Sequence, residues 1–236
     1  MKYNRVLLKL SGESLAGDTA YGIDSVRLHQ YASEIQEVFT TGVQVAIVIG
    51  GGNIFRGLKG SLTGFDRQTG DYMGMLATVI NSLALQKALE NSGVKVKLMS
   101  ALKIEGLAEK TNGLQAIKYL ESGFLVILSG GTGNPFFTTD TASALRAVEI
   151  KADAMLKGTR VDGVYTDDPE KNPSAKKYDR LTFQEAYEKD LKIMDLTAFT
   201  LCEENNIPIV VFNINQPGNL KKLLGGEKLG TLISKD

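Results

Sequence analysis

Histidine, cysteine and tryptophan are scarce in this chain of 236 residues, which holds one histidine, one cysteine and no tryptophan. A zinc site built from histidine and cysteine ligands is therefore not expected. The single cysteine, Cys202, cannot form an internal disulfide bond, which agrees with a reducing compartment. Serine-histidine catalysis is also not expected, because Ser11 has no histidine placed to serve it, and His29 lies in a predicted helix away from the glycine-rich turns.

An excess of charge of one sign is missing as well. Lys and Arg together number 27, Asp and Glu together number 27, and the formal net charge is zero. Proteins that bind nucleic acid by neutralising phosphates, or membranes through a polybasic segment, typically carry a basic excess. We therefore expect neither nucleic acid nor a membrane among the partners.

Long apolar runs are missing too. The longest strongly apolar stretch, residues 43–49, is far shorter than the roughly 18–20 residues of a membrane-spanning helix. The first ten residues carry three basic side chains and no apolar core of a signal peptide. We expect a cytoplasmic protein.

Short apolar segments alternate with amphipathic ones along the whole chain. Strands are predicted at residues 6–8, 43–49, 94–99, 124–128, 154–156 and 209–212. Helices are predicted after Asp24, over residues 72–92, around 114–120, over 141–150, after Thr182 and over 196–205. This order predicts an α/β fold, a three-layer sandwich with a mostly parallel central sheet and helices on both faces. We treat residues 1–236 as a single domain, with the polar stretch 164–180 as a surface excursion.

Glycine, in contrast, is abundant directly after several of the predicted strands. Glycine-rich turns follow three predicted strands, at residues 9–13 (KLSGE), 50–57 (GGGNIFRG) and 129–135 (SGGTGNP). The carboxyl ends of parallel strands meet at one edge of a sheet, where ligands bind. Exposed backbone N–H groups in such turns suit anionic oxygens. One such turn would be read as a tight connection, but three of them favour a phosphate site.

Two basic residues accompany these turns. Lys9 interrupts an apolar strand, and a buried ammonium group needs an anionic partner. The alternative is an edge strand from which Lys9 reaches water. Arg56 follows the triple glycine, and its planar guanidinium group suits bidentate contact with phosphate. Taken alone, Arg56 would be read as a surface arginine.

Three aspartates have two interpretations each. Asp71, Asp140 and Asp195 all stand where a helix is predicted to begin, so each could be a helix N-cap. As functional residues they could orient Lys9 or hold Mg²⁺. For each aspartate taken alone, capping is the simpler interpretation.

The standard nucleotide-binding motifs are absent. The chain has no G-x-x-x-x-G-K-[ST] motif, and Phe55 stands where a G-x-G-x-x-G motif would need its third glycine. A P-loop protein and a dinucleotide-dependent dehydrogenase are therefore disfavoured.

Six motifs together identify a different nucleotide-binding class. They are KLSGE at 9–13, GGGNIFRG at 50–57, GDYMGMLAT at 70–78, GTGNPFFTTD at 131–140, TRVDGVY at 159–165 and KIMDLTAF at 192–199. Over essentially its whole length the chain resembles the amino acid kinase family, and within it the branch whose acceptor is UMP. The resemblance implies Mg²⁺-dependent transfer of the ATP γ-phosphate to UMP, giving UDP, in pyrimidine nucleotide synthesis.

The resemblance also implies a role for each matching residue. Catalytic roles fall to Lys9, Asp140 and Asp195. ATP would be bound by Lys9, Leu10, Ser11, Gly12, Gly52, Arg56, Thr159, Tyr165 and Asp168. UMP would be bound by Gly51, Arg56, Asp71, Thr132, Gly133, Asn134, Pro135, Phe136, Phe137, Thr138 and Thr139. Mg²⁺ would be held mainly through the ATP phosphates, with no certain protein ligand. The acceptor lobe would be mainly N-terminal and the ATP lobe mainly C-terminal.

Assembly and regulation are implied in the same way. Members of this branch are homo-oligomers, as a rule hexamers, with GTP as an activator and UTP as an inhibitor. The loop linked to effectors would be Gly17, Asp18, Thr19, Ala20, Tyr21 and Gly22, which matches the family in position only. Two alternatives stay open: a kinase of the same superfamily acting on a carboxylate or carbamate, and a nucleotide sensor without activity.

Overall fold

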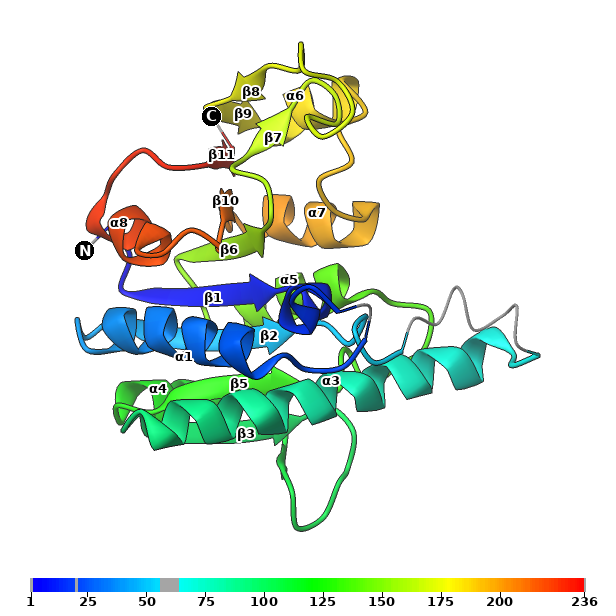
Figure 1. Cartoon of the computed structure of the whole chain (residues 1–236), viewed down its shortest axis with the longest axis vertical. Coiled ribbons are helices and arrows are strands. Elements are labelled where there is room, and N and C mark those ends of the chain that lie inside the picture. Colours follow the sequence, from blue (N-terminus) through cyan, green and yellow to red (C-terminus); the bar gives the residue numbers. More distant parts are fainter. Residues whose placement is uncertain (1, 20, 56–63, 236) are drawn as a thin grey trace.

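The computed structural model describes residues 2–19, 21–55 and 64–235. Within these ranges, nine strands form one sheet in the order β4-β3-β5-β2-β1-β6-β10-β11-β9 (Figure 1). The strands are β1 (Arg5–Leu10), β2 (Gln44–Ile49), β3 (Val96–Ser100), β4 (Glu109–Lys110), β5 (Leu125–Ser129), β6 (Ala154–Thr159), β9 (Arg180–Thr182), β10 (Ile209–Asn213) and β11 (Thr231–Ser234). All neighbouring pairs are parallel except β10 and β11.

Helices cover both faces of this sheet. The helices α1 (Ser25–Phe39), α3 (Arg67–Asn91) and α8 (Asn219–Gly225) pack on one face, where Leu8 and Leu10 of β1 are buried. The helices α4 (Gly113–Glu121), α5 (Thr139–Glu149), α6 (Phe183–Glu188) and α7 (Leu196–Glu204) pack on the other face, with Leu7. Successive residues of a strand point to opposite faces, so one apolar strand supplies two cores. The predicted three-layer α/β sandwich is confirmed.

Helix boundaries follow from local capping. Asp24 caps α1 by accepting a hydrogen bond from the Arg27 backbone N–H, as expected. Thr182 and Glu185 form the predicted capping box of α6. The helix α3 begins earlier than predicted, because Asp66 rather than Asp71 is its N-cap. The N-cap of α5 is Thr138, so the capping interpretation is wrong for both Asp71 and Asp140.

Several short elements were not predicted from the sequence. The excursion at 164–180 contains an antiparallel hairpin of β7 (Val164–Tyr165) and β8 (Lys177–Tyr178). The strands β4, β9 and β11, the helix α8 and a 3-10 turn at Gly12–Ala16 were missed as well. These elements are too short for a sequence period to be recognised.

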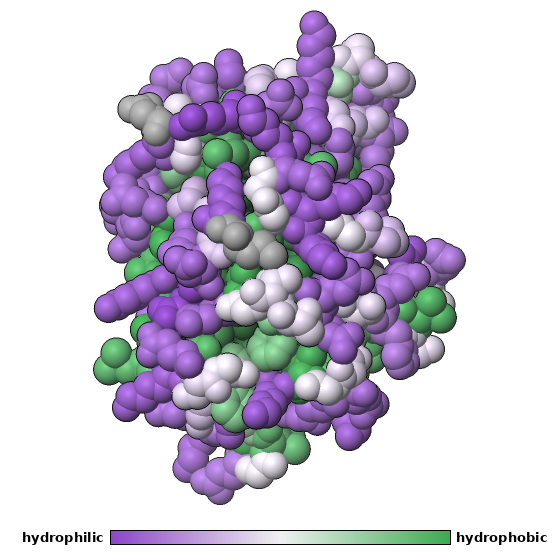
Figure 2. Space-filling view, turned by 90° about the vertical axis from the view of Figure 1, so that its left-hand side faces the viewer, coloured by the Kyte–Doolittle hydropathy of each residue, from purple (hydrophilic) through white to green (hydrophobic). Residues whose placement is uncertain are grey.

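The parallel strands β1 and β2 point toward the same end of the molecule. In Figure 1, the arrows of β1 and β2 point toward the turn that follows β1 and toward the N-terminal half of α3. Figure 2 shows the left-hand side of Figure 1, which is the end that these two arrows point away from. Most side chains on this face are hydrophilic, with apolar ones scattered between them. The strands β1, β2 and β5 run parallel, so the glycine-rich turns that follow them lie at the same end of the sheet. No helix of the described ranges is long and apolar enough to cross a membrane.

Candidate active site

Two lysines lie side by side where the central strands end. Lys9 of β1 and Lys157 of β6 are directly opposite each other in the parallel register, so both side chains leave the same face of the sheet. Both reach the carboxylate of Asp140 at the start of α5. The Lys9 Nζ lies 3.0 Å from Asp140 Oδ1, and the Lys157 Nζ lies 2.8 Å from Oδ2. Lys157 also donates to the Ile193 carbonyl at 2.5 Å.

The two ammonium groups share the carboxylate of Asp140. Burial by itself would raise the pKa of Asp140, but the adjacent Lys9 and Lys157 outweigh burial and lower the pKa. Burial and the like charge of Lys9 lower the pKa of Lys157, against the opposing attraction of Asp140. Asp140 is therefore ionised at neutral pH, and its carboxylate is shared by the two lysine side chains.

Lys9 is not on an edge strand, so the snorkelling alternative is wrong. The strand β1 lies between β2 and β6, and the Lys9 side chain is 13% exposed. The expectation that a buried lysine needs an anionic partner holds, and in this structure the partner is Asp140.

Asp195 joins the first turns of two helices. It caps α7 by accepting from the Ala198 backbone N–H at 3.0 Å. Its other bonds go to α5: it accepts from the Thr141 hydroxyl at 2.8 Å, and its Oδ2 accepts from the hydroxyl of Thr138. The capping interpretation is thus correct for Asp195, and the cap also places the N-terminal ends of α5 and α7 beside the lysines.

The first two glycine-rich turns touch each other. A Cβ atom built on Gly12 would lie 2.3 Å from the Gly50 carbonyl oxygen, so only glycine permits this approach. A Cβ on Gly51 would lie 2.7 Å from the Ala77 Cβ of α3. The third turn, with Gly130, is tied to the same helix because the Gly130 N–H donates to the Thr78 hydroxyl at 2.9 Å.

A cavity of about 540 Å³ opens beside these turns. Six of the residues predicted to bind UMP or ATP line it: Gly51, Gly52, Asp71, Phe137, Thr138 and Thr139. Eight further lining residues were not predicted, and they are Glu13, Phe55, Arg67, Gly70, Gly74, Met75, Thr78 and Gly131. Thr132, Gly133, Asn134, Pro135 and Phe136 are not in its wall as the structure describes it.

Asp71 ties the loop of these five residues to α3. Its Oδ2 accepts from the Phe136 backbone N–H at 2.7 Å and lies 3.6 Å from the Arg67 Nε. The Arg67 guanidinium also lies over the Phe136 ring, 5.7 Å from its centroid. Phe136 has a φ of 75°, which is strained for a side chain of this size. The bond from Asp71 helps to hold this strained turn.

A second large cavity, of about 770 Å³, lies on the C-terminal half of the sheet. Lys157 lines it together with the predicted ATP residues Thr159, Tyr165 and Asp168. A smaller cavity of about 360 Å³ shares Lys157 and Thr159 with it and adds Lys9 and Ser11. Leu10 is fully buried in the core, so its side chain faces none of these cavities.

Sequence reasoning missed Lys157, although the signal was present. Lys157 follows the apolar residues 154–156 of a predicted strand, the same pattern that drew attention to Lys9. It also missed Asn53 and Asn81, two fully buried amides that hydrogen-bond to each other in both directions. Nothing in the sequence around these asparagines indicates burial.

The asparagine pair ties separate loops together. Asn81 donates to the Gly50 carbonyl at 2.7 Å, and Asn53 donates to the Gly22 carbonyl at 2.7 Å. The loop predicted to respond to effectors is thereby anchored at Gly22 to the triple-glycine turn, while its Tyr21 is 80% exposed. Ala20 of this loop and Arg56 lie outside the described residues.

The described residues do not form a ready metal site. No group of three or more His, Cys, Asp or Glu side chains among them is placed to hold a metal ion. Asp140 is engaged by two ammonium groups, and Asp195 by hydroxyl and backbone donors. Side-chain ligation of Mg²⁺ by these two aspartates therefore does not fit the structure.

The other candidate side chains are structural. Cys202 is fully buried in α7, and burial raises the pKa of its thiol to about 12. A thiol with this pKa stays protonated at neutral pH and is a poor nucleophile. His29 is exposed on α1, with its Nδ1 2.6 Å from the Ser25 carbonyl oxygen.

Comparisons with known proteins identify the family of this chain. The model of the amino acid kinase family matches residues 4–213. Uridylate kinase from Porphyromonas gingivalis is 63% identical, over 98% of this chain and 97% of that protein. Uridylate kinase from Parabacteroides distasonis is 61% identical, over 98% of both. The chain belongs to the amino acid kinase family.

Solved structures extend the likeness to three dimensions. The structure of UMP kinase from Bacillus anthracis matches with a TM-score of 0.97 and 42% identity, covering 100% of this chain and 98% of that one. UMP kinase from Ureaplasma parvum matches with a TM-score of 0.93 and 39% identity, covering 100% of both. Within the family, the similar proteins described here are named uridylate kinase or UMP kinase.

The lysine cluster makes a testable prediction about stability. Asp140→Asn leaves two buried ammonium groups facing each other, and we expect the free energy of unfolding to fall by roughly 3–5 kcal/mol. Removing one ammonium as well, in Asp140→Asn/Lys157→Met, should restore much of that loss. Denaturant unfolding of the three proteins measures this. An Asp140→Asn variant as stable as the parent chain would contradict the charge assignment.

Proposed function

We propose that this chain is a UMP kinase, which transfers the γ-phosphate of ATP to UMP and yields ADP and UDP for pyrimidine nucleotide synthesis. The observation that carries the proposal is the pair of buried lysines around Asp140. Both lysines line the cavity of about 360 Å³, which shares Lys157 with the cavity of about 770 Å³ and Glu13 with the cavity of about 540 Å³. Close relatives named uridylate kinase support the acceptor.

The acceptor explains why the site has no histidine. The second pKa of a phosphate monoester is about 6, so UMP arrives mostly as a dianion at neutral pH. A nucleophile that is already ionised needs no general base. The remaining task is to bring two polyanions together in line and to stabilise the charge of the transferring group.

The chain's own residues divide this task. Lys9 and Lys157 supply positive charge at the transferring phosphoryl group, and Asp140 holds both ammonium groups in place. Backbone N–H groups of the turns at 10–12 and 50–52 would bind the phosphates. Asp195 would position the start of α5 against α7, close to the same phosphates.

Each nucleotide is assigned to one half of the domain. The cavity of about 540 Å³, lined by residues between 13 and 139, would hold UMP, with Asp71 on the ribose. The cavity of about 770 Å³, lined by residues between 157 and 211, would hold the nucleoside of ATP. An acceptor lobe mainly in the N-terminal half and an ATP lobe mainly in the C-terminal half follow from this. Arg56 is proposed to contact phosphate because of its position in the GGGNIFRG motif at 50–57.

Metal use, assembly and regulation are part of the same proposal. Mg²⁺ would enter on the ATP phosphates and supply further charge neutralisation there. The protein would form a homo-oligomer, a hexamer, in the cytoplasm, with GTP as an activator and UTP as an inhibitor. The anchored loop with Gly22 and Tyr21 is the proposed route of that control.

An acceptor panel tests the proposed function against a kinase for amino acids and against a sensor without activity. UMP, CMP, aspartate and glutamate are offered with ATP and Mg²⁺, each with and without GTP and UTP, while release of ADP is measured. We expect rapid ADP release with UMP and none with the amino acids. Turnover of aspartate or glutamate, or no turnover at all, would contradict the proposal.

Lys9 is expected to act on the chemical step. Lys9→Ala removes one of two charges at the transferring group, and we expect kcat to fall by about 100-fold or more. Steady-state kinetics with ATP and UMP measure this, and Lys103→Ala, at an exposed lysine, is the matched control. Turnover of Lys9→Ala near that of the parent would remove Lys9 from the catalytic set.

Asp71 is expected to act on the acceptor. Asp71→Asn keeps the shape but loses the charge that orders the Phe136 turn and would meet the ribose, so KM for UMP should rise more than KM for ATP. Both constants come from the same two-substrate kinetics. Equal changes in the two constants would contradict this role.

A further inference from the structure

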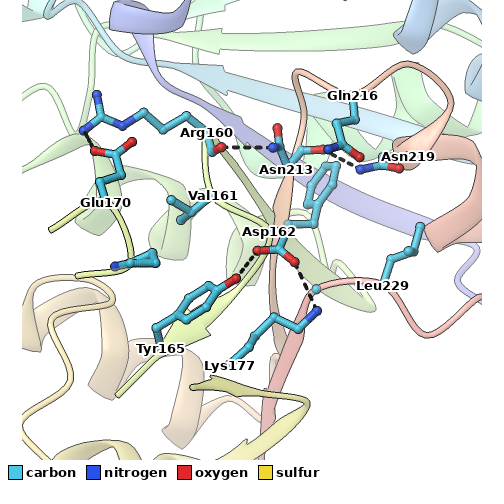
Figure 3. Close-up of a pocket in the computed structure, with 13 residues that line it drawn as sticks. Arg160, Val161, Asp162, Tyr165, Glu170, Lys177, Asn213, Gln216, Asn219 and Leu229 are labelled. Atoms are coloured by element: carbon cyan, nitrogen blue, oxygen red, sulfur yellow. Dashed lines mark hydrogen bonds and ion pairs between the residues drawn. The ribbon is translucent and has the colours of Figure 1, made fainter. Parts of the chain in front are cut away.

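Tyr165 stands between two cavities. It lines the proposed ATP cavity of about 770 Å³ and also a second cavity of about 400 Å³, shown in Figure 3. Val161 and Pro169 line both cavities too. The orientation of the Tyr165 ring therefore sets part of the boundary of the larger cavity. An aromatic face at such a wall suits stacking against a nucleotide base.

The Tyr165 ring is held from its far end by Asp162. Figure 3 shows the Asp162 carboxylate between the Tyr165 hydroxyl and the Lys177 side chain. Tyr165 donates to Asp162 Oδ1 at 2.5 Å, and the Lys177 Nζ donates to Oδ2 at 3.2 Å. A hydrogen bond to an ionised carboxylate is shorter and stronger than one between neutral groups.

The charge states agree with this geometry. The pKa of Asp162 is lowered, because the bond from Tyr165 and the nearby Lys177 outweigh the effect of burial, which would raise it. The hydrogen bond to Asp162 raises the pKa of the Tyr165 phenol. At neutral pH the phenol is protonated and the carboxylate is ionised, which is the combination that the bond requires.

The backbone places all three groups. Asp162 lies in the turn after β6, Tyr165 ends β7, and Lys177 begins β8. Tyr165 and Lys177 are directly paired across the β7–β8 hairpin, so their side chains leave the same face of it. These three residues, called the clamp below, connect the β7–β8 hairpin to the turn after β6.

We infer that Asp162 and Lys177 are positioning residues for the donor nucleotide, which hold the Tyr165 ring as a wall of the ATP cavity. The inference rests on the proposed function, and neither residue is among those assigned to ATP above. It predicts an effect on ATP binding that leaves UMP binding and the chemical step alone, since the clamp lies on the donor half of the sheet.

The test uses Asp162→Asn, Tyr165→Phe and the double variant in the full chain. The first variant removes the charge and the second removes only the hydroxyl. We expect each single change to raise KM for ATP by about 3- to 10-fold, the usual effect of losing one such hydrogen bond. The double variant should bind ATP no worse than the more impaired of the two single variants, because one change removes the donor and the other removes the charge of the acceptor of the same bond. KM for UMP and kcat should stay within about twofold.

Matched controls come from the same surface region. Tyr178→Phe, within β8, and Asp179→Asn, directly after it, make the same two chemical changes outside the clamp. Both should leave KM for ATP unchanged. Calorimetric titration with a non-hydrolysable ATP analogue provides the dissociation constant independently of turnover.

The outcomes separate this inference from the proposed function. If the parent phosphorylates UMP but the clamp variants keep its KM for ATP, or raise KM for UMP equally, the clamp has no positioning role. If the parent proves inactive on UMP, the proposed function fails, and the titrations still decide the inference. In that case, unchanged affinity of the clamp variants for the analogue would overturn it.

Discussion

The register between β1 and β6 is the constraint on which the site depends. It sets Lys9 directly opposite Lys157, which brings two ammonium groups together at the centre of a buried sheet. Like charges so close would repel, and burial makes the repulsion costly. Asp140, brought to the same place by α5, compensates one of them. One carboxylate thus holds two lysine side chains together at the end of the central strands.

The rest of the molecule supports this triad. Asp195 fixes the start of α5 through Thr141 and so helps to place Asp140. The close approach of Gly12 to Gly50 brings two glycine-rich turns against each other. Both lysines line the cavity of about 360 Å³, which shares lining residues with the larger cavities on the two halves of the sheet. A kinase that transfers a phosphoryl group between two nucleotides suits this arrangement, because the main obstacle to the reaction is the repulsion between two polyanions and not the transfer of a proton.

The sequence was most informative where residue patterns are long or chemically unusual. Apolar strands and capping residues predicted the layers correctly, and a lysine inside an apolar strand indicated a charged centre. Lys157 was not predicted as a site residue because its strand was predicted to end at residue 156, although β6 runs to Thr159. The burial of Asn53 and Asn81, and the bond from Phe136 to Asp71, depend on contacts between segments far apart in the chain. No local pattern carries that information.

The most direct measurement of the central claim is the binding of a transition-state analogue. ADP, UMP and Mg²⁺ with aluminium fluoride mimic the transferring phosphoryl group, and calorimetry compares their binding with and without fluoride. Fluoride should tighten binding by at least about 100-fold in the parent chain, and Lys157→Met should remove most of this gain while UMP alone still binds normally. An undiminished gain in Lys157→Met would contradict the claim that the paired lysines stabilise the transferring group.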